Sequence, residues 1–180
     1  MCTPALAHQP ILNKGKEYPV NAPFEITEPE ISKAFYAELN GEPQYYRIVS
    51  DIAFRFYAGV TVPKIDGCPL TRRFSFDVLD AKLEPIVVAD GETFEWWPWF
   101  ESFGKKWYWV GPEVGADFKS DREFAAGTYL IRVYNEENTG RYVLAVGDIE
   151  SFTPDVIAKT MIVLPGINRE YWDSVTCDLQ

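Results

Sequence analysis

The chain has 180 residues, of which 47% are hydrophobic, and a formal net charge of −10. This length fits one domain, and the apolar fraction is that of a globular protein rather than a disordered one. The negative charge argues against a nucleic-acid partner and against adsorption to an anionic membrane, because both need clustered Lys and Arg. The sequence contains no run of about 18 apolar residues, so it predicts no membrane span.

The first seven residues, MCTPALA, end in a small-x-small pattern similar to a signal-peptidase site, although the usual charged and apolar regions do not precede it. Two interpretations stay open: residues 1–7 are a signal-peptide remnant and the mature chain begins at His8, or they are a disordered tail. Without Cys2, an even pair remains, Cys68 and Cys177. In an exported protein we expect these two to form a disulfide, and two unrelated thiols are the alternative.

An extended lead-in over residues 8–29 precedes a series of short alternating segments. Residues 30–39 fit either a short helix or a strand before the turn signal Asn40-Gly41. Alternation predicts strands over 44–50, 53–62 and 72–80, and an apolar run predicts a short buried strand at 85–89. Within the third of these, we expect one set of side chains inward, Phe74, Phe76 and Val78, and the other outward, Arg73, Ser75 and Asp77.

Residues 127–147 alternate on both sides of the turn-like NEENTG and predict a β-hairpin. A helix is then expected from Thr153 as N-cap and Pro154 in the first turn to Pro165-Gly166. This order predicts an all-β protein: an antiparallel, jelly-roll-like β-sandwich over residues 8–150 and a short C-terminal helical appendage over 151–180.

Two segments resemble bacterial pre-peptidase C-terminal domains, which are extracytoplasmic β-sandwiches. LNGEPQYYRI (39–48) is similar to their opening motif, and AAGTYLIRVYNEENTGRYVLAVG (125–147) is similar to their closing hairpin. The resemblance covers roughly residues 34–148 and implies the fold and export, but no catalysis. We expect Gly127 to permit a tight strand entry and Tyr129 to act as a tyrosine corner, with its hydroxyl bonded to backbone. Neither the tryptophan-rich segment nor the helix belongs to the family pattern.

The sequence argues against most enzyme classes. His8, near the terminus, is the single histidine, so the sequence argues against a Ser-His-Asp or Cys-His site within the fold. No phosphate loop, dinucleotide motif or nucleophile elbow is present. Glu95 and Glu101 are conceivable as the paired carboxylates of a hydrolase, but in so acidic a chain such a pair arises by chance. We therefore expect a non-catalytic protein.

Metal binding is an alternative with weak sequence support. His8 as the mature N-terminus would offer its amine and ring to copper, but the chain has no second histidine to complete such a site. A structural calcium ion would use loop carboxylates, for which the candidates are Asp66, Asp117 and Asp121. Because no regular calcium-loop motif is present, we expect no cofactor, with a structural calcium as the alternative.

Residues 92–113 carry five of the six tryptophans, namely Trp96, Trp97, Trp99, Trp107 and Trp109. With Glu95, Glu101 and Glu113 nearby, these rings suit a protein partner or a glycan, and the alternative is that they fill the core. We expect Trp97 and Trp99 to face outward around Pro98, and Trp107 and Trp109 to face inward. The sequence therefore predicts a secreted, periplasmic or cell-surface binding module that contacts a protein or cell-envelope partner, with carbohydrate binding as the alternative.

Overall fold

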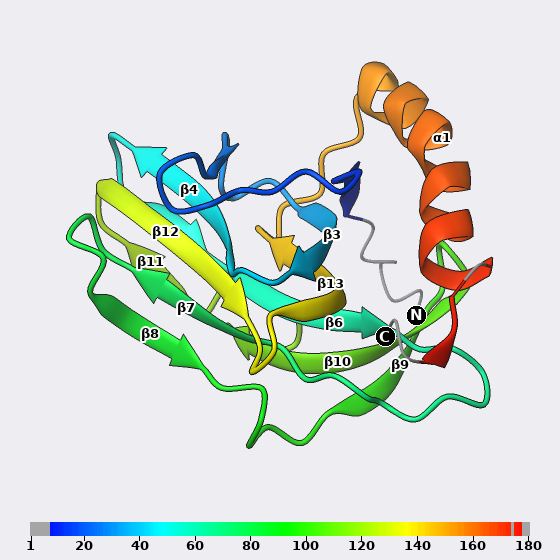
Figure 1. The fold of residues 1–180 in the computed structure, drawn as a ribbon. Coiled ribbons are helices and arrows are strands. Elements are labelled where there is room, and N and C mark those ends of the chain that lie inside the picture. The colour runs from blue at the N-terminus through cyan, green and yellow to red at the C-terminus, as the bar shows by residue number, and fades with distance from the viewer. Residues whose placement is uncertain (1–7, 174, 178–180) are drawn as a thin grey trace.

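The computed structural model describes residues 8–173 and 175–177 and shows two packed β-sheets with a helix at one end (Figure 1). None of the helices in the described part is long and apolar enough to cross a membrane. The elements are β1 (Gln9–Leu12), β2 (Phe24–Ile26), β3 (Lys33–Asn40), β4 (Gln44–Ser50), β5 (Phe54–Phe56), β6 (Ala58–Pro63), β7 (Ser75–Leu79), β8 (Pro85–Ala89), β9 (Trp97–Glu101), β10 (Lys106–Val114), β11 (Arg122–Phe124), β12 (Gly127–Tyr134), β13 (Thr139–Val146), α1 (Pro154–Asn168) and the π-helix η1 (Arg169–Asp173).

The two main sheets have the strand orders β1-β3-β13-β6-β10-β9 and β2-β4-β12-β7-β8, and β11 pairs with β5 separately. The expected β-sandwich with a C-terminal helix is confirmed. Two pairs depart from the antiparallel pattern, because β1 runs parallel to β3 and β2 runs parallel to β4. Both arise from the extended lead-in, whose short strands add to the sheet edges.

The predicted hairpin over 127–147 is wrong, although both of its strands exist. β12 pairs with β4 and β7, whereas β13 pairs with β3 and β6 in the other sheet. The connecting loop is closed by Asn135, whose amide donates to the carbonyl of Thr139 at 2.7 Å and whose Oδ1 accepts from the Thr139 N–H at 3.1 Å. Alternation shows that a strand has one buried face, but it does not identify the neighbour that the strand pairs with.

The core lies between the two sheets and is rich in aromatic residues. Its largest fully buried side chains include Phe35, Tyr46, Phe56, Phe74, Phe76, Ile131, Tyr142 and Leu144. Tyr129 packs partly against this core, and its hydroxyl donates to the carbonyl of Ala125 at 3.1 Å, as expected of a tyrosine corner. Gly127 does not have the expected role, because its φ is not positive and an added Cβ would meet only the Tyr129 ring, at 3.6 Å.

Four other expectations are settled by the fold. Residues 30–39 contribute the strand β3, and the long strand expected over 53–62 divides at Tyr57 into β5 and β6. β8 lies at a sheet edge and is exposed rather than buried, with Val88 60% exposed. Ser75 and Asp77, expected to face outward, are both buried.

The helix α1 begins at Pro154 as expected but continues through Pro165 to Asn168 and into η1. Thr153 makes no side-chain capping bond to the backbone, and its hydroxyl donates instead to the carboxylate of Asp155 at 2.5 Å. Near its C-terminal end the helix is anchored by the buried Ile167. This anchoring explains why the chain does not leave the helix at Pro165-Gly166.

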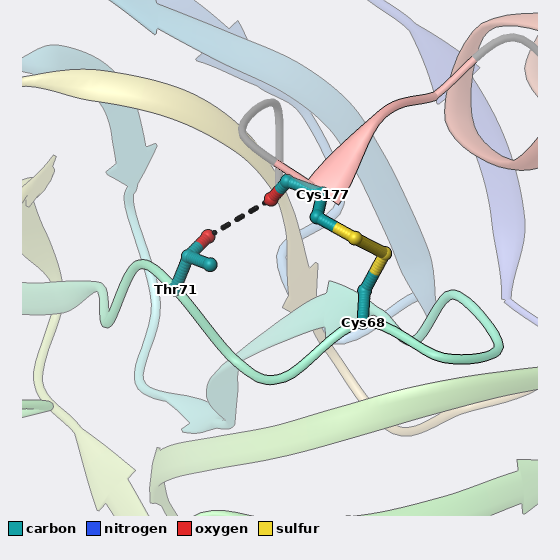
Figure 2. The surroundings of a disulfide bond; sticks show 3 residues. All are labelled: Cys68, Thr71 and Cys177. Atoms are coloured by element: carbon teal, nitrogen blue, oxygen red, sulfur yellow. Dashed lines mark hydrogen bonds between the residues drawn. A yellow bond between two sulfur atoms is a disulfide. The ribbon is translucent and has the colours of Figure 1, made fainter.

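A disulfide joins Cys68, in the loop between β6 and β7, to Cys177 near the C-terminus, with their Cα atoms 5.3 Å apart (Figure 2). The Thr71 hydroxyl donates to the carbonyl of Cys177 at 3.2 Å. The structure thus contains the pairing expected from the sequence. It ties the chain that follows α1 and η1 back to the body of the sandwich.

We expect the double variant Cys68→Ser, Cys177→Ser to lose about 2 to 4 kcal/mol of unfolding free energy, because the bridge closes a long loop in the unfolded chain. The two cysteines are 109 residues apart in sequence. Urea unfolding of the variant, with the oxidised wild type as reference, measures the effect. An unchanged midpoint would mean that the bridge only tethers the C-terminal tail.

Candidate functional site

The outer face of the six-stranded sheet is hollowed because small residues occupy its centre. Ala34 on β3 lies opposite Ala145 on β13, which in turn lies opposite Gly59 on β6. Successive side chains of a strand point to opposite faces of the sheet, and residues directly opposite on neighbouring strands share a face. These three small residues therefore form a shallow floor between larger neighbours. The resulting cavity, here called the outer pocket, has a volume of about 80 Å³. This space holds a few water molecules or the end of one side chain.

Six aromatic side chains line the outer pocket, namely Tyr36, Tyr57, Trp99, Phe103, Tyr108 and Phe118. The Trp99 ring lies 4.8 Å from that of Phe118 and 6.0 Å from that of Tyr108, measured between centroids. Tyr171 and Trp172 of η1 pack against Tyr36, and together with the end of α1 they cover the neighbouring part of the same sheet face. The C-terminal appendage therefore bounds the outer pocket.

Two tyrosine hydroxyls are paired within this wall. The oxygen atoms of Tyr36 and Tyr108 are 2.7 Å apart and buried. The pKa of Tyr36 is raised to about 12, mainly by burial and to a smaller extent by the charge of Glu101, whereas its hydrogen bond to Tyr108 has the opposite effect. Burial also raises the pKa of Tyr108 well above its ordinary value. Both hydroxyl groups are thus neutral at physiological pH and can donate and accept hydrogen bonds.

Two carboxylates, Glu101 and Glu113, also line the outer pocket. Glu101 accepts hydrogen bonds from the backbone N–H groups of Phe103, at 2.6 Å, and Gly104, at 2.5 Å. Glu113 accepts through Oε2 from the Tyr57 hydroxyl at 3.1 Å and from the Phe118 N–H at 3.2 Å. These bonds fix the orientation of both groups, and a carboxylate has about four lone-pair sites, so acceptor capacity remains on each.

His8 lines the outer pocket and is partly buried, with its Nδ1 in a hydrogen bond with the Ser32 hydroxyl. Burial, followed by the positive charge of Lys119, lowers the pKa of His8 from its ordinary 6.5 to about 4. The imidazole is therefore neutral at physiological pH.

We expect acidification from pH 7 to pH 5 to cost about 2 kcal/mol of stability through His8 alone. Its folded-state pKa is about 4 and its ordinary value 6.5, so between these values the unfolded chain binds the extra proton. Stability should therefore fall as the pH falls through this window and be insensitive to His8 above it. Urea unfolding across the window measures the loss, and His8→Gln should remove most of the slope. An equal slope in that variant would contradict the assignment.

The candidate metal ligands are not gathered by the fold. In residues 8–173 and 175–177, no group of three or more His, Cys, Asp or Glu side chains is placed to hold a metal ion. Asp66 and Asp117 are exposed, and Asp121 is paired with Arg122 at 2.8 Å. The His8 nitrogen Nδ1 already bonds Ser32. The fold therefore does not bring these candidate ligands together within the described part of the chain.

The tryptophans of the 92–113 segment occupy three different environments. Trp96 is only 9% exposed and belongs to the core. Its expected place among the ligand-binding residues is therefore wrong. Trp97, 42% exposed, and Trp99, partly buried, lie on the outer face of the sheet. Trp109 packs against the core, but Trp107, expected inward, is 43% exposed and contacts Phe100 near the tip of the β9–β10 hairpin.

Glu95 and Glu101, the conceivable catalytic pair, are not brought together in the outer pocket. Glu95 is exposed and lines a separate hollow beside β8, whereas Glu101 lines the outer pocket. Sequence reasoning found Trp99, Glu101 and His8 but missed the floor residues Ala34, Gly59 and Ala145. No local pattern marks these small residues, because they come from three distant strands.

No family model matches the chain, and no curated protein matches it. Among solved structures, the chain is similar to the pre-peptidase C-terminal domain of a collagenase from Bacillus anthracis, with a TM-score of 0.37 and 11% identity, covering 75% of this chain and 98% of that one. The family is the one that the motifs at 39–48 and 125–147 resemble. A likeness at this TM-score and identity carries no argument about what this chain is or what it binds.

Proposed function

We propose that this protein is a non-catalytic, extracytoplasmic binding module that holds a protein or cell-envelope partner at the outer pocket. The observation that carries the proposal is the pocket itself, a hollow in a sheet face with six aromatic side chains and two carboxylates in its lining. Pockets lined mostly by apolar and aromatic side chains, with a few placed polar groups, are typical of binding sites. The disulfide supports an extracytoplasmic setting, because such bonds persist in oxidising compartments.

Trp97 extends the binding surface beyond the rim of the outer pocket. Its ring is 6.1 Å from that of Phe118, whose ring is in turn next to that of Trp99, and 42% of the Trp97 residue is exposed. Large exposed aromatic groups that adjoin a pocket often mark a contact surface. Because Trp99 is held against Phe118 and Tyr108 before any partner arrives, little side-chain freedom is lost on binding.

A glycan is the second candidate, favoured by the same rings. Trp97, Trp99 and Phe118 form a row of aromatic faces, and Glu113 bonds the backbone of Phe118. The flat C–H face of a sugar stacks on such rings while a carboxylate accepts a hydrogen bond from a hydroxyl group. This version predicts binding to neutral oligosaccharides without a requirement for any charged group on the ligand.

The test compares aromatic residues on the two faces of the β9–β10 hairpin. We expect Trp97→Ala combined with Trp99→Ala to abolish binding to ligands selected from a displayed peptide library or a glycan array, because both rings belong to the proposed surface. Trp97→Ala alone should change stability by at most about 0.5 kcal/mol. The matched control is Trp107→Ala, since Trp107 is 43% exposed but lies on the opposite face.

Retention of binding by the double variant would contradict the proposal, and so would an equal loss in Trp107→Ala. The type of ligand selected separates the two candidates: peptides support a protein partner, and oligosaccharides support carbohydrate binding. Melting curves of all variants must show that the fold is retained, because Trp99 also packs against Tyr108.

A further inference from the structure

The lining of the outer pocket carries negative charge without a compensating cation. Among its described residues are Glu101 and Glu113 and neither Lys nor Arg. The one basic group in the lining is His8, which is neutral at physiological pH for the reasons given above. In the described part of the chain, neither carboxylate forms an ion pair, and each is held only by neutral N–H or O–H donors.

Two cations near this region are directed elsewhere. The Lys119 ammonium, whose charge lowers the pKa of His8, donates to the carbonyl of Asp148 at 3.1 Å. The Lys106 ammonium lies 5.0 Å from the centre of the Trp172 ring. Neither side chain lines the outer pocket. A ligand that enters it therefore meets two fixed carboxylates whose charge is balanced only from outside the cavity.

The aromatic side chains that line the outer pocket also favour a positively charged ligand. The faces of Trp and Tyr rings attract a cation within about 6 Å, and this attraction grows when the cation is desolvated. The alkyl stem of a Lys or Arg side chain packs well along such rings while its charged end reaches a polar partner. A cavity of about 80 Å³ admits the end of one side chain.

From this combination we infer that the outer pocket binds the protonated side chain of an Arg or Lys residue of a partner protein. The inference rests on the proposed function and specifies the chemistry of its ligand. The N–H groups of the incoming side chain donate to Glu101 or Glu113, and its stem and charge lie against Trp99 and Tyr108. An anionic ligand is disfavoured by the same carboxylates, and a neutral sugar makes no use of their charge.

The direct test is a titration followed by the backbone and indole N–H signals in NMR spectra of the ¹⁵N-labelled protein. The probes are acetylated, amidated Gly-Arg-Gly and Gly-Lys-Gly. Their controls are Gly-citrulline-Gly, which has nearly the shape of the arginine peptide without its charge, choline, which is a cation without N–H donors, and methyl glucoside. We expect the two basic peptides to shift the indole signal of Trp99, with Trp107 as an unaffected reference, and the citrulline peptide to bind at least about tenfold more weakly.

Charge-removing variants locate the contact. Glu113→Gln and Glu101→Gln should each weaken binding of the arginine peptide about tenfold or more, because each removes a partner of the buried cation. Glu95→Gln is the matched control, since it removes the same charge from a neighbouring exposed position outside the outer pocket. The amide keeps an oxygen that accepts a hydrogen bond, and two separate Gln variants guard against the loss of one to misfolding.

The inference is overturned if the citrulline peptide or choline binds as tightly as the arginine peptide, or if only methyl glucoside shifts the Trp99 signal. It is also overturned if no basic peptide binds at about 10 mM, a tenfold excess over a millimolar Kd. Different results would contradict the cation preference and the proposed function. If Trp97 and Trp99 are required for ligand capture and both Gln variants bind normally, the binding surface stands and its preference for a cation is wrong. If neither set of residues matters, the proposed function itself is wrong.

Discussion

Replacement of Trp96 by alanine is expected to lower the free energy of unfolding by about 3 to 5 kcal/mol, the usual range for removing a large ring from a core. The indole is 9% exposed, and its N–H donates to the carbonyl of Gly91 at 2.7 Å. The far edge of the ring packs against the backbone of Gly111, where an added Cβ would lie 2.3 Å from Cη2. Alanine would therefore leave a cavity, remove a buried hydrogen bond and expose the glycine.

The adjacent Trp97 is the control for this prediction, because it has the same side chain and is 42% exposed on the outer face of the sheet. Urea unfolding of both alanine variants measures the difference. Gly111→Ala should also destabilise the protein, since its new methyl group would collide with the Trp96 ring. If Trp96→Ala were no more costly than Trp97→Ala, the core position of Trp96 would be wrong.

The positions of these tryptophans could be predicted from the sequence only in part. Their crowding into 92–113 is visible at once, and alternation around Pro98 correctly places Trp97 and Trp99 on one face. The sequence does not assign Trp96 to the core, because its ring packs against Gly111 of β10, which comes close to it only in the folded chain. Burial of Trp107 was misjudged because alternation assigns a face of the sheet and does not say whether that face is covered near a hairpin tip.

The same division between local and long-range information runs through the fold. Strand positions and the helix start follow from periodicity and from Pro154, which are local features. The bridge Cys68–Cys177 follows from the cysteine count once Cys2 is set aside. Partner strands are a long-range feature, so the turn between β12 and β13 was read as a hairpin although it joins two sheets. The outer pocket has the same origin, since its floor needs Ala34, Gly59 and Ala145 to lie side by side.

Arg132→Ala is expected to destabilise the protein by about 3 to 5 kcal/mol, because it leaves a buried carboxylate without its charged partner. On the outer face of the five-stranded sheet, Arg132 forms an ion pair with Asp77, whose side chain is only 2% exposed. After the substitution, the Tyr134 hydroxyl, at 3.1 Å, would be the side-chain donor left to Asp77 among the described residues. The reciprocal change, Asp77→Asn, should cost less, since the Arg132 side chain is 37% exposed and water can solvate it.

A second ion pair in the same sheet supplies the control. Arg47 pairs with Glu25 at 2.6 Å, but their side chains are 44% and 51% exposed, so Arg47→Ala should cost no more than about 1 kcal/mol. Urea unfolding of the three variants and of Arg132→Ala combined with Asp77→Asn completes the comparison. In the combined variant the uncompensated carboxylate is gone, and the loss should be smaller than the sum of the single losses. Equal costs for Arg132→Ala and Arg47→Ala would mean that water reaches Asp77, because only a desolvated carboxylate makes the loss of its partner so costly.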